Sequence, residues 1–169
     1  TNVMVITGAE SMSSYKVIGE RDCFDLEYWS LEQAKLGKGA EKPLARQVAV
    51  VTGGGSGIGA ATAQAFAAVG CEVAVLDRDI KAAKTVADSF GGLAIACDVT
   101  NARSINAALD KVAATYGGVD IVVSNAGAAW QGRIGDVSDK VLRQSFELNF
   151  WGHQNVAKKA TQIMRAQGT

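Results

Sequence analysis

A β-branched apolar run that leads straight into a glycine-rich turn constrains the fold of this chain more than any other feature. Residues 48–52 read Val-Ala-Val-Val-Thr, residues 53–59 read Gly-Gly-Gly-Ser-Gly-Ile-Gly, and an alanine-rich segment without proline follows at 60–68. β-Branched runs favour strands and alanine favours helices. The pattern therefore predicts a strand, a tight turn and a helix.

The glycine spacing predicts a site for a diphosphate. It is a relative of the GxGxxG fingerprint with the first gap widened. Glycine admits positive φ and leaves room where a Cβ would block a ligand, so that N–H groups at the positive end of the helix dipole can approach phosphates. An ordinary glycine turn is the alternative. The candidate binding residues are Gly53, Ser56, Gly57, Ile58 and Gly59.

An acidic residue follows the next predicted strand. The strand 71–76 ends at Asp77, eighteen positions after Gly59, and dinucleotide folds place a ribose-binding carboxylate about 20 residues after the glycines. The alternative is a turn or helix-cap aspartate before a predicted helix at 80–90. A carboxylate here repels a 2′-phosphate and favours NAD(H), whereas Arg78 can pair with that phosphate. We give Asp77 precedence because its repulsion acts at the 2′ position itself.

Composition disfavours several classes of partner. Lysine plus arginine and aspartate plus glutamate each number 17, so no net charge attracts nucleic acid or an anionic membrane. The three cysteines have no metal-ligand spacing and are typical of a reduced cytoplasmic protein. His153, the single histidine, is read as a packing or surface residue rather than a base or metal ligand. No apolar run is long enough to span a membrane.

From residue 47 onward, predicted strands and helices alternate. The strands 48–52, 71–76, 93–97 and 120–124 are separated by the helices 60–68, 80–90 and 104–116, and a long helix follows at 137–166. Such alternation predicts an α/β fold with a doubly wound parallel sheet. Gly152 lies inside the long helix, where glycine costs about 1 kcal/mol relative to alanine unless another segment packs closely.

Five blocks in chain order resemble the short-chain dehydrogenase/reductase family: residues 52–59, Asp77, Asp98-Val99, Asn125-Ala126-Gly127 and 148–152. The resemblance implies a Rossmann sheet with the strand order 3-2-1-4. It implies that the glycine turn holds the pyrophosphate of NAD, Asp77 the adenosine ribose, and Asp98 and Val99 the adenine.

The resemblance also assigns residues beyond the first two strands. Asn125, Ala126 and Gly127 are implied to line the cofactor cleft and to steady the central strand. Asn149 is implied to anchor a water of the proton relay, and the alternative is a hydrogen-bonded polar residue inside a helix. Residues 128–136, with Trp130 and Arg133, lie where substrate or cofactor can reach them, although a tryptophan packed on the sheet edge is an equal alternative.

The resemblance implies hydride transfer between NAD(H) and a hydroxyl or carbonyl of a small substrate. The family uses a serine and a Tyr-x-x-x-Lys motif for proton transfer, and this sequence contains no Tyr-x-x-x-Lys. We therefore expect a C-terminally truncated, inactive piece of a dehydrogenase with an incomplete sheet. The alternative is a non-catalytic NAD-binding module for sensing or scaffolding. An open strand edge at 120–124 and an uncovered helix at 137–166 predict self-association.

Residues 1–46 differ from the rest and are expected to form the tail of an upstream domain with a helical linker. Segment 22–36 has early acids, a late lysine and Gly37 as a stop signal, which predict a helix, and 38–43 contains the only proline. Segments 7–10 and 23–36 resemble the end of the aldolase half of bifunctional class II sugar-phosphate aldolase/short-chain dehydrogenases. This resemblance implies a sugar-derived substrate, and position 1, which is not Met, is expected not to be the natural start.

Overall fold

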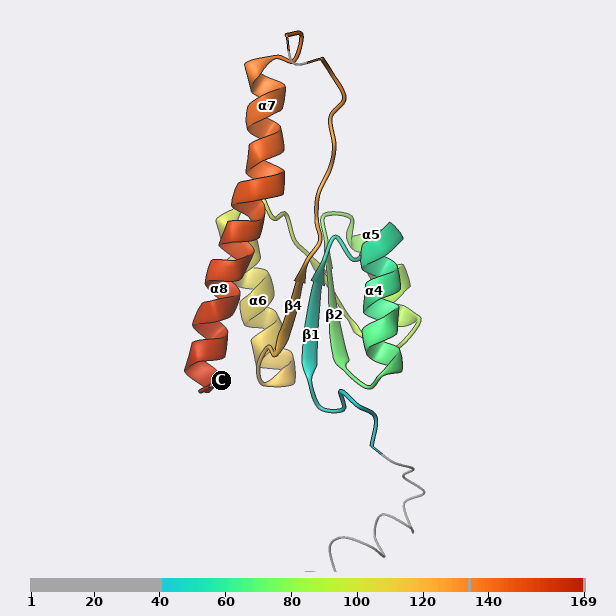
Figure 1. Cartoon of the computed structure of the whole chain (residues 1–169). Helices are drawn as coiled ribbons and strands as arrows, with labels where there is room; N and C mark the ends of the chain where they lie inside the picture. Colours follow the sequence, from blue (N-terminus) through green and yellow to red (C-terminus); the bar gives the residue numbers. More distant parts are fainter. Residues whose placement is uncertain (1–40, 134, 169) are drawn as a thin grey trace, which may run out of the picture. The chain divides into compact units, whose positions relative to one another are not determined.

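The computed structural model describes residues 41–133 and 135–168, drawn in colour in Figure 1. The expected helix at 22–36 and the aldolase-like segments lie outside these residues. The described chain alternates strands and helices, as predicted. The elements are β1 (Val48–Thr52), α4 (Gly57–Ala68), β2 (Glu72–Asp77), α5 (Ile80–Asp88), β3 (Leu93–Ala96), α6 (Ala102–Tyr116), β4 (Ile121–Ser124), α7 (Asp139–Phe146), the π-helical turn η2 (Glu147–Trp151) and α8 (Gly152–Gln167).

The four strands form one parallel sheet in the order β3-β2-β1-β4, which confirms the predicted fold class and strand order. Val50 of β1 pairs with Ala74 of β2 on one side and with Val122 of β4 on the other. Because β1 is central, both of its faces are covered, and this explains why residues 48–51 are all apolar rather than alternating.

Each face of the sheet has its own apolar core. Val48 and Val50 lie in one core with residues of α6 and α8, whereas Ala49 and Val51 lie in the other with Ala63 of α4 and residues of α5. In Figure 1, α6 and α8 accordingly cover one face of the sheet and α4 and α5 the other. The prediction of a doubly wound sheet is thereby confirmed at the level of packing.

Two helices begin earlier than expected. Helix α4 begins at Gly57 instead of residue 60, within the glycine turn itself. Helix α6 begins at Ala102 instead of residue 104, because the side-chain Oδ1 of Asn101 accepts hydrogen bonds from the N–H groups of Arg103 and Ser104. The first start brings the helix N-terminus directly to the end of β1.

The last helical segment is one continuous rod in Figure 1, made of α7, η2 and α8. It begins at Asp139 rather than residue 137, because Ser138 caps it by accepting from the N–H of Val141. The π turn was not predicted. Gly152 is buried, and a Cβ there would lie 3.2 Å from both Cγ2 and the carbonyl oxygen of Val99. Close packing therefore offsets the helix cost of this glycine.

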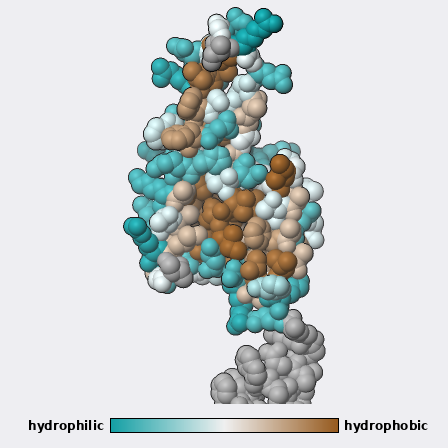
Figure 2. All heavy atoms as spheres, in the orientation of Figure 1, coloured by the Kyte–Doolittle hydropathy of each residue, from teal (hydrophilic) through white to brown (hydrophobic). Residues whose placement is uncertain are grey.

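Strand β4 is an edge of the described sheet. Its apolar residues Ile121, Val122 and Val123 are only half-buried, and Figure 2 shows hydrophobic atoms at the surface where Figure 1 places β4. Further along, the side chains of Leu142, Phe146, Phe150 and Trp151 are exposed on α7 and η2. No helix among the described residues is both long and apolar enough to cross a membrane.

Candidate functional site

The carboxyl ends of all four strands open into one cleft of about 710 Å³. Ligands of open parallel sheets bind at this edge, and the volume is that of a small-molecule site. Every strand contributes residues that follow it, and α7 and η2 close one side. The lining residues are Gly53, Arg78, Cys97, Asp98, Val99, Thr100, Ala126, Gly127, Ala128, Trp130, Gln144, Glu147 and Leu148.

The glycine turn allows helix α4 to pack against the end of β1. Gly53 has φ +63°, and a Cβ on it would lie 2.8 Å from Cα of Ala126. A Cβ on Gly59 would overlap the carbonyl oxygen of Gly53. These two glycines are therefore required for backbone packing. Gly57 has φ +52°, and nothing lies within 4 Å of the position of a Cβ there.

The N-terminus of α4 is open. Ser56 is its N-cap, but the Ser56 side chain makes no capping hydrogen bond, and Ser56, Gly57 and Ile58 are all exposed. The Ile58 side chain is 80% exposed. The first N–H groups of a helix have no partner within it, so this end of α4 offers donors and a positive dipole beside the cleft residue Gly53.

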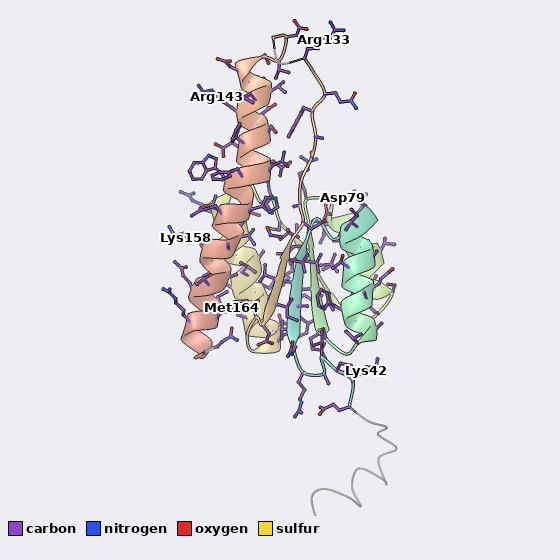
Figure 3. The ribbon with its side chains drawn as sticks, in the orientation of Figure 1. Lys42, Asp79, Arg133, Arg143, Lys158 and Met164 are labelled. Carbon is purple, nitrogen blue, oxygen red and sulfur yellow. The ribbon has the colours of Figure 1, made fainter. Side chains whose placement is uncertain are left out.

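Asp77 supports the glycine turn from the neighbouring strand. Its Oδ2 accepts a hydrogen bond from the N–H of Gly55 at 2.9 Å, and its Oδ1 accepts from the N–H of Asp79 at 2.9 Å. The cap of α5 is Asp79, whose Oδ1 accepts from Lys81 and Ala82, and Figure 3 shows Asp79 at the start of that helix. Asp77 is thus a turn residue, and the helix-cap interpretation belongs to Asp79.

Asp98 lies on the exposed side of the cleft, next to the buried Val99. The pKa of Asp98 is lowered chiefly because its Oδ1 accepts from the hydroxyl and the N–H of Thr100, at 2.7 and 2.9 Å, and further by the positive charge of Arg78. Val99 contacts Gly152 of the long helix. The loop after β3 therefore presents an ionised carboxylate and is braced by α8.

Asn125 ties the end of β4 to the end of β1. Its side-chain Nδ2 donates to the carbonyl oxygens of Thr52 and Gly53, at 3.1 and 3.3 Å. The Oγ1 of Thr52 accepts from the N–H groups of Asn125 and Ala126, at 3.0 and 3.2 Å. Thr52 is 1% exposed. The role of Thr52 was not predicted from the sequence, although a lone hydroxyl at the end of an apolar strand is a signal for it.

Asn149 lies in the π turn and holds the backbone that leaves β4. Its Nδ2 donates to the carbonyl oxygen of Ala128 at 2.8 Å and to Oγ of Ser145 at 3.2 Å, and its Oδ1 accepts from the N–H of Ala128 at 3.1 Å. π turns occur frequently at functional sites. Asn149 is therefore a hydrogen-bonded polar residue inside a helix, which was the alternative to a role in the proton relay, and it lies beside Gly127.

These geometries are those of a nucleotide-binding Rossmann sheet, and residues 47–169 match the short chain dehydrogenase family. The chain belongs to this family. Residues 1–36 match the second domain of class II aldolases.

An uncharacterised oxidoreductase of Bacillus subtilis, YuxG, is 34% identical over 173 residues, which cover 98% of this chain and 25% of that protein. D-threitol dehydrogenase of Mycolicibacterium smegmatis is 46% identical over 88 residues, 49% of this chain and 34% of that protein. The crystal structure of a 3-ketoacyl-(acyl-carrier-protein) reductase from Brucella melitensis in complex with NADH superimposes with a TM-score of 0.72 at 31% identity, over 74% of this chain and 53% of that one. The chain thus spans between a quarter and about half of these relatives.

Three further residues considered from the sequence, Trp130, Arg133 and His153, lie in different parts of the structure. Trp130 lines the cleft and is 41% exposed, whereas Arg133 does not line it and lies at the tip of the loop in Figure 3. His153 packs from α8 against β4, where its Nδ1 lies 2.6 Å from Oγ of Ser124. Among residues 41–133 and 135–168, no cluster of histidine, cysteine, aspartate or glutamate could hold a metal ion.

Proposed function

We propose that this chain forms the nucleotide-binding part of an NAD(H)-dependent oxidoreductase that transfers a hydride between the cofactor and a hydroxyl or carbonyl of a small substrate. The observation that carries the proposal is the convergence of four strand ends and the open N-terminus of α4 on one cleft. The crystal structure of the Brucella reductase in complex with NADH supports the choice of cofactor.

The residues in and beside the cleft fit a dinucleotide. Gly53, which lines the cleft, and Gly57, where nothing lies within 4 Å of the position of a Cβ, would receive the pyrophosphate together with the N–H groups that follow Ser56. Ile58 would border it from the first turn of α4. NAD(H) itself would supply the hydride or its acceptor.

The other strand ends complete the proposed site. Asp77 and Arg78 would hold the adenosine ribose at the end of β2, while Asp98 and Val99 would lie against the adenine. The carboxylate of Asp77 is oriented by the N–H groups of Gly55 and Asp79, and in the proposed site its charge would repel a 2′-phosphate. We therefore propose NAD(H) rather than NADP(H). The segment formed by Asn125, Ala126 and Gly127 would form the side of the cleft opposite the glycine turn, and Asn149 would hold the residue that follows, Ala128, in place.

A sugar-derived or polyol substrate is the proposal for the complete enzyme. The aldolase match at residues 1–36 and the name of the D-threitol dehydrogenase support it. From the aldolase match we propose that the complete enzyme is a bifunctional cytoplasmic aldolase/dehydrogenase. Because the sequence contains no Tyr-x-x-x-Lys, we propose that the groups for proton transfer lie outside these 169 residues. The same absence supports the second candidate function, an NAD-binding sensor or scaffold without catalysis.

Calorimetric titration of the chain with NADH and NADPH tests the cofactor proposal. We expect binding of NADH, and loss of that binding in Ile58→Glu, because a carboxylate at the N-terminus of α4 would repel the phosphates. The substitution suits the helix itself, since position 58 is exposed and the helix dipole favours a negative charge there. Gln64→Glu adds the same charge on the exposed side of the same helix and serves as the control. Equal NADH affinity in both variants would place the nucleotide elsewhere.

A longer protein that carries this chain distinguishes the enzyme from the sensor. We expect polyol-dependent formation of NADH, measured by absorbance, if the protein is a dehydrogenase. Binding of NADH without turnover of any polyol or sugar would support the sensing or scaffolding function instead.

We also propose that the chain forms homo-oligomers. The exposed side chains of Leu142, Phe146 and Phe150 lie four residues apart on one helix face and end beside Trp151. Light scattering is expected to give more than the 17.6 kDa of one chain, and Phe146→Lys is expected to lower that mass. Lys158→Glu on the exposed face of α8 is the control, and a monomeric starting protein contradicts the proposal.

A further inference from the structure

We propose that Ser124 and His153 form a positioning pair that sets the wall of the cleft, a role separate from contact with any ligand. The wall, defined here as residues 126–128, lines the cleft directly after β4. Oγ of Ser124 and Nδ1 of His153 are 2.6 Å apart and join the last residue of β4 to the first turn of α8. The effect on nucleotide affinity rests on the proposed function, whereas the effect on the wall does not.

The wall has no regular secondary structure of its own and depends on side chains around it. Thr52 accepts the N–H of Ala126 from the β1 side, and Asn149 holds both the N–H and the carbonyl oxygen of Ala128 from the helix side. The backbone of Ser124 pairs with Thr52 in the sheet. The Ser124–His153 bond is then the direct polar link between the origin of the wall and the long helix.

His153 and Asn149 act along one face of that helix. Ser145, Asn149 and His153 recur every four residues, and residues at this spacing share a face. Ser145 bonds Asn149, Asn149 bonds Ala128, and His153 bonds Ser124. The long helix therefore hydrogen-bonds to two residues four positions apart, Ser124 at the end of β4 and Ala128 at the end of the wall.

The hydrogen bonds between Asn149 and Ala128 depend on the position of the helix along β4. Asn149 reaches two backbone atoms of one residue, at 2.8 and 3.1 Å, and hydrogen bonds weaken steeply when such geometry is lost. Apolar contacts between α8 and the sheet, such as those of Val156, are non-directional. The hydrogen bond from the half-buried His153, one turn after Asn149, is directional and fixes the position of α8 along β4, which apolar packing alone does not fix.

Amide hydrogen exchange followed by NMR tests the positioning role without any ligand. We expect His153→Leu and Ser124→Ala each to speed exchange of the Ala128 amide by about fivefold, the loss of one hydrogen bond. Because both changes remove the same bond, the double variant is expected to match the single ones rather than multiply them. His153→Asn keeps a polar group near the Nδ1 position and should preserve the wild-type rate.

The control is Gln154→Leu, which places the same apolar side chain on the exposed side of α8. An Ala128 exchange rate in His153→Leu equal to that of the control would overturn the proposal, and so would multiplicative effects in the double variant. If His153→Leu fails to fold, Ser124→Ala, which removes a single oxygen, together with His153→Asn decides the same question.

NADH titration of the same variants measures the functional consequence. We expect the dissociation constant to rise by about fivefold in His153→Leu and Ser124→Ala and to stay unchanged in His153→Asn. If the wild-type chain binds no NADH, the proposed function fails, while the exchange rates still decide the positioning role. If NADH binds equally to all variants although the wall exchanges faster, the pair positions the wall without serving the nucleotide.

Discussion

The two sides of the cleft are built by different means. On the β1 side, the turn at 53–59 is shaped by the backbone: a Cβ on Gly53 would meet Ala126, and one on Gly59 would overlap the Gly53 carbonyl. On the β4 side, the wall is held by the side chains of Asn125, Asn149 and Ser124 with His153. Backbone packing leaves a local signature of glycines, whereas side-chain bonds across the fold leave none.

The largest expected effect is a loss of stability on the β1 side of the cleft, where backbone packing shapes the glycine turn. Gly59→Ala places a methyl group against the Gly53 carbonyl, which cannot move without shifting the end of β1, so we expect the free energy of unfolding to fall by about 3 kcal/mol or more. Gly57→Ala meets no atom and incurs only the strain of its positive φ, about 1.5 kcal/mol. Urea unfolding measures both. Similar losses in the two variants would show that steric contact is not what shapes the turn.

The next effect tests the bond network that joins the two sides. Thr52→Val keeps the shape of the side chain but leaves the N–H groups of Asn125 and Ala126 without their acceptor, which we expect to cost about 2 kcal/mol. Thr85→Val removes an exposed hydroxyl that bonds within its own helix and should cost far less. A Thr52→Val protein as stable as Thr85→Val would mean that the two strand ends are joined by packing alone.

A smaller effect separates the charge of Asp77 from its role in the turn. Asp77→Asn keeps an oxygen to accept from Gly55 but removes the negative charge, so we expect NADPH to gain affinity relative to NADH by about tenfold, one unit of charge repulsion at close range. Calorimetric titration with both nucleotides gives the ratio. Asp79→Asn, a neighbouring helix cap, is the matched variant, and an equal change there would remove Asp77 from the ribose site.

The smallest effect concerns pH and the loop after β3. The pKa of Asp98 lies below its ordinary value of 3.8 because Thr100 donates two hydrogen bonds to it. A carboxylate with a lowered folded-state pKa stabilises the fold above the ordinary pKa and loses that contribution as pH falls through the folded-state pKa.

Acid unfolding curves test this contribution of Asp98. Asp98→Asn should therefore flatten the fall in stability below about pH 4, and Thr100→Val should flatten part of it. The effect is small because the carboxylate is exposed. Unchanged acid unfolding in both variants would contradict it.

Much of the fold followed from the sequence, for reasons that particular elements make plain. Strand β1 is apolar at its first four positions because it is buried on both faces, and Gly53 and Gly59 are required where α4 meets its end. Gly152 was expected to need a close neighbour, and Val99 is that neighbour. Each of these features is a local steric demand, which a residue type records directly.

The predictions from the sequence were wrong or incomplete where a side chain bonds to a residue distant in the sequence, or where a helix can start at more than one residue. Asn101 as the cap of α6 moved a helix start by two residues. The π turn that carries Asn149 has no marker in the sequence, and the contacts beside it, from Asn149 to Ala128 and from Gly152 to Val99, both reach segments distant along the chain. Arg133 was placed near the cleft from its distance along the chain, but the loop carries it to the tip.

The sequence by itself determined the strands, the glycine turn and the α/β class, because these depend on the period of the apolar residues and on positions where a Cβ does not fit. The family followed from five motif blocks that the sequence carries in order. Only the tertiary structure decided how the cleft is held together. The bonds from Asn125 to β1, from Asn149 to Ala128 and from His153 to Ser124 join residues 73, 21 and 29 positions apart. The hydrogen-bond partner of a polar side chain depends on which segments packing brings together, and no local pattern encodes that.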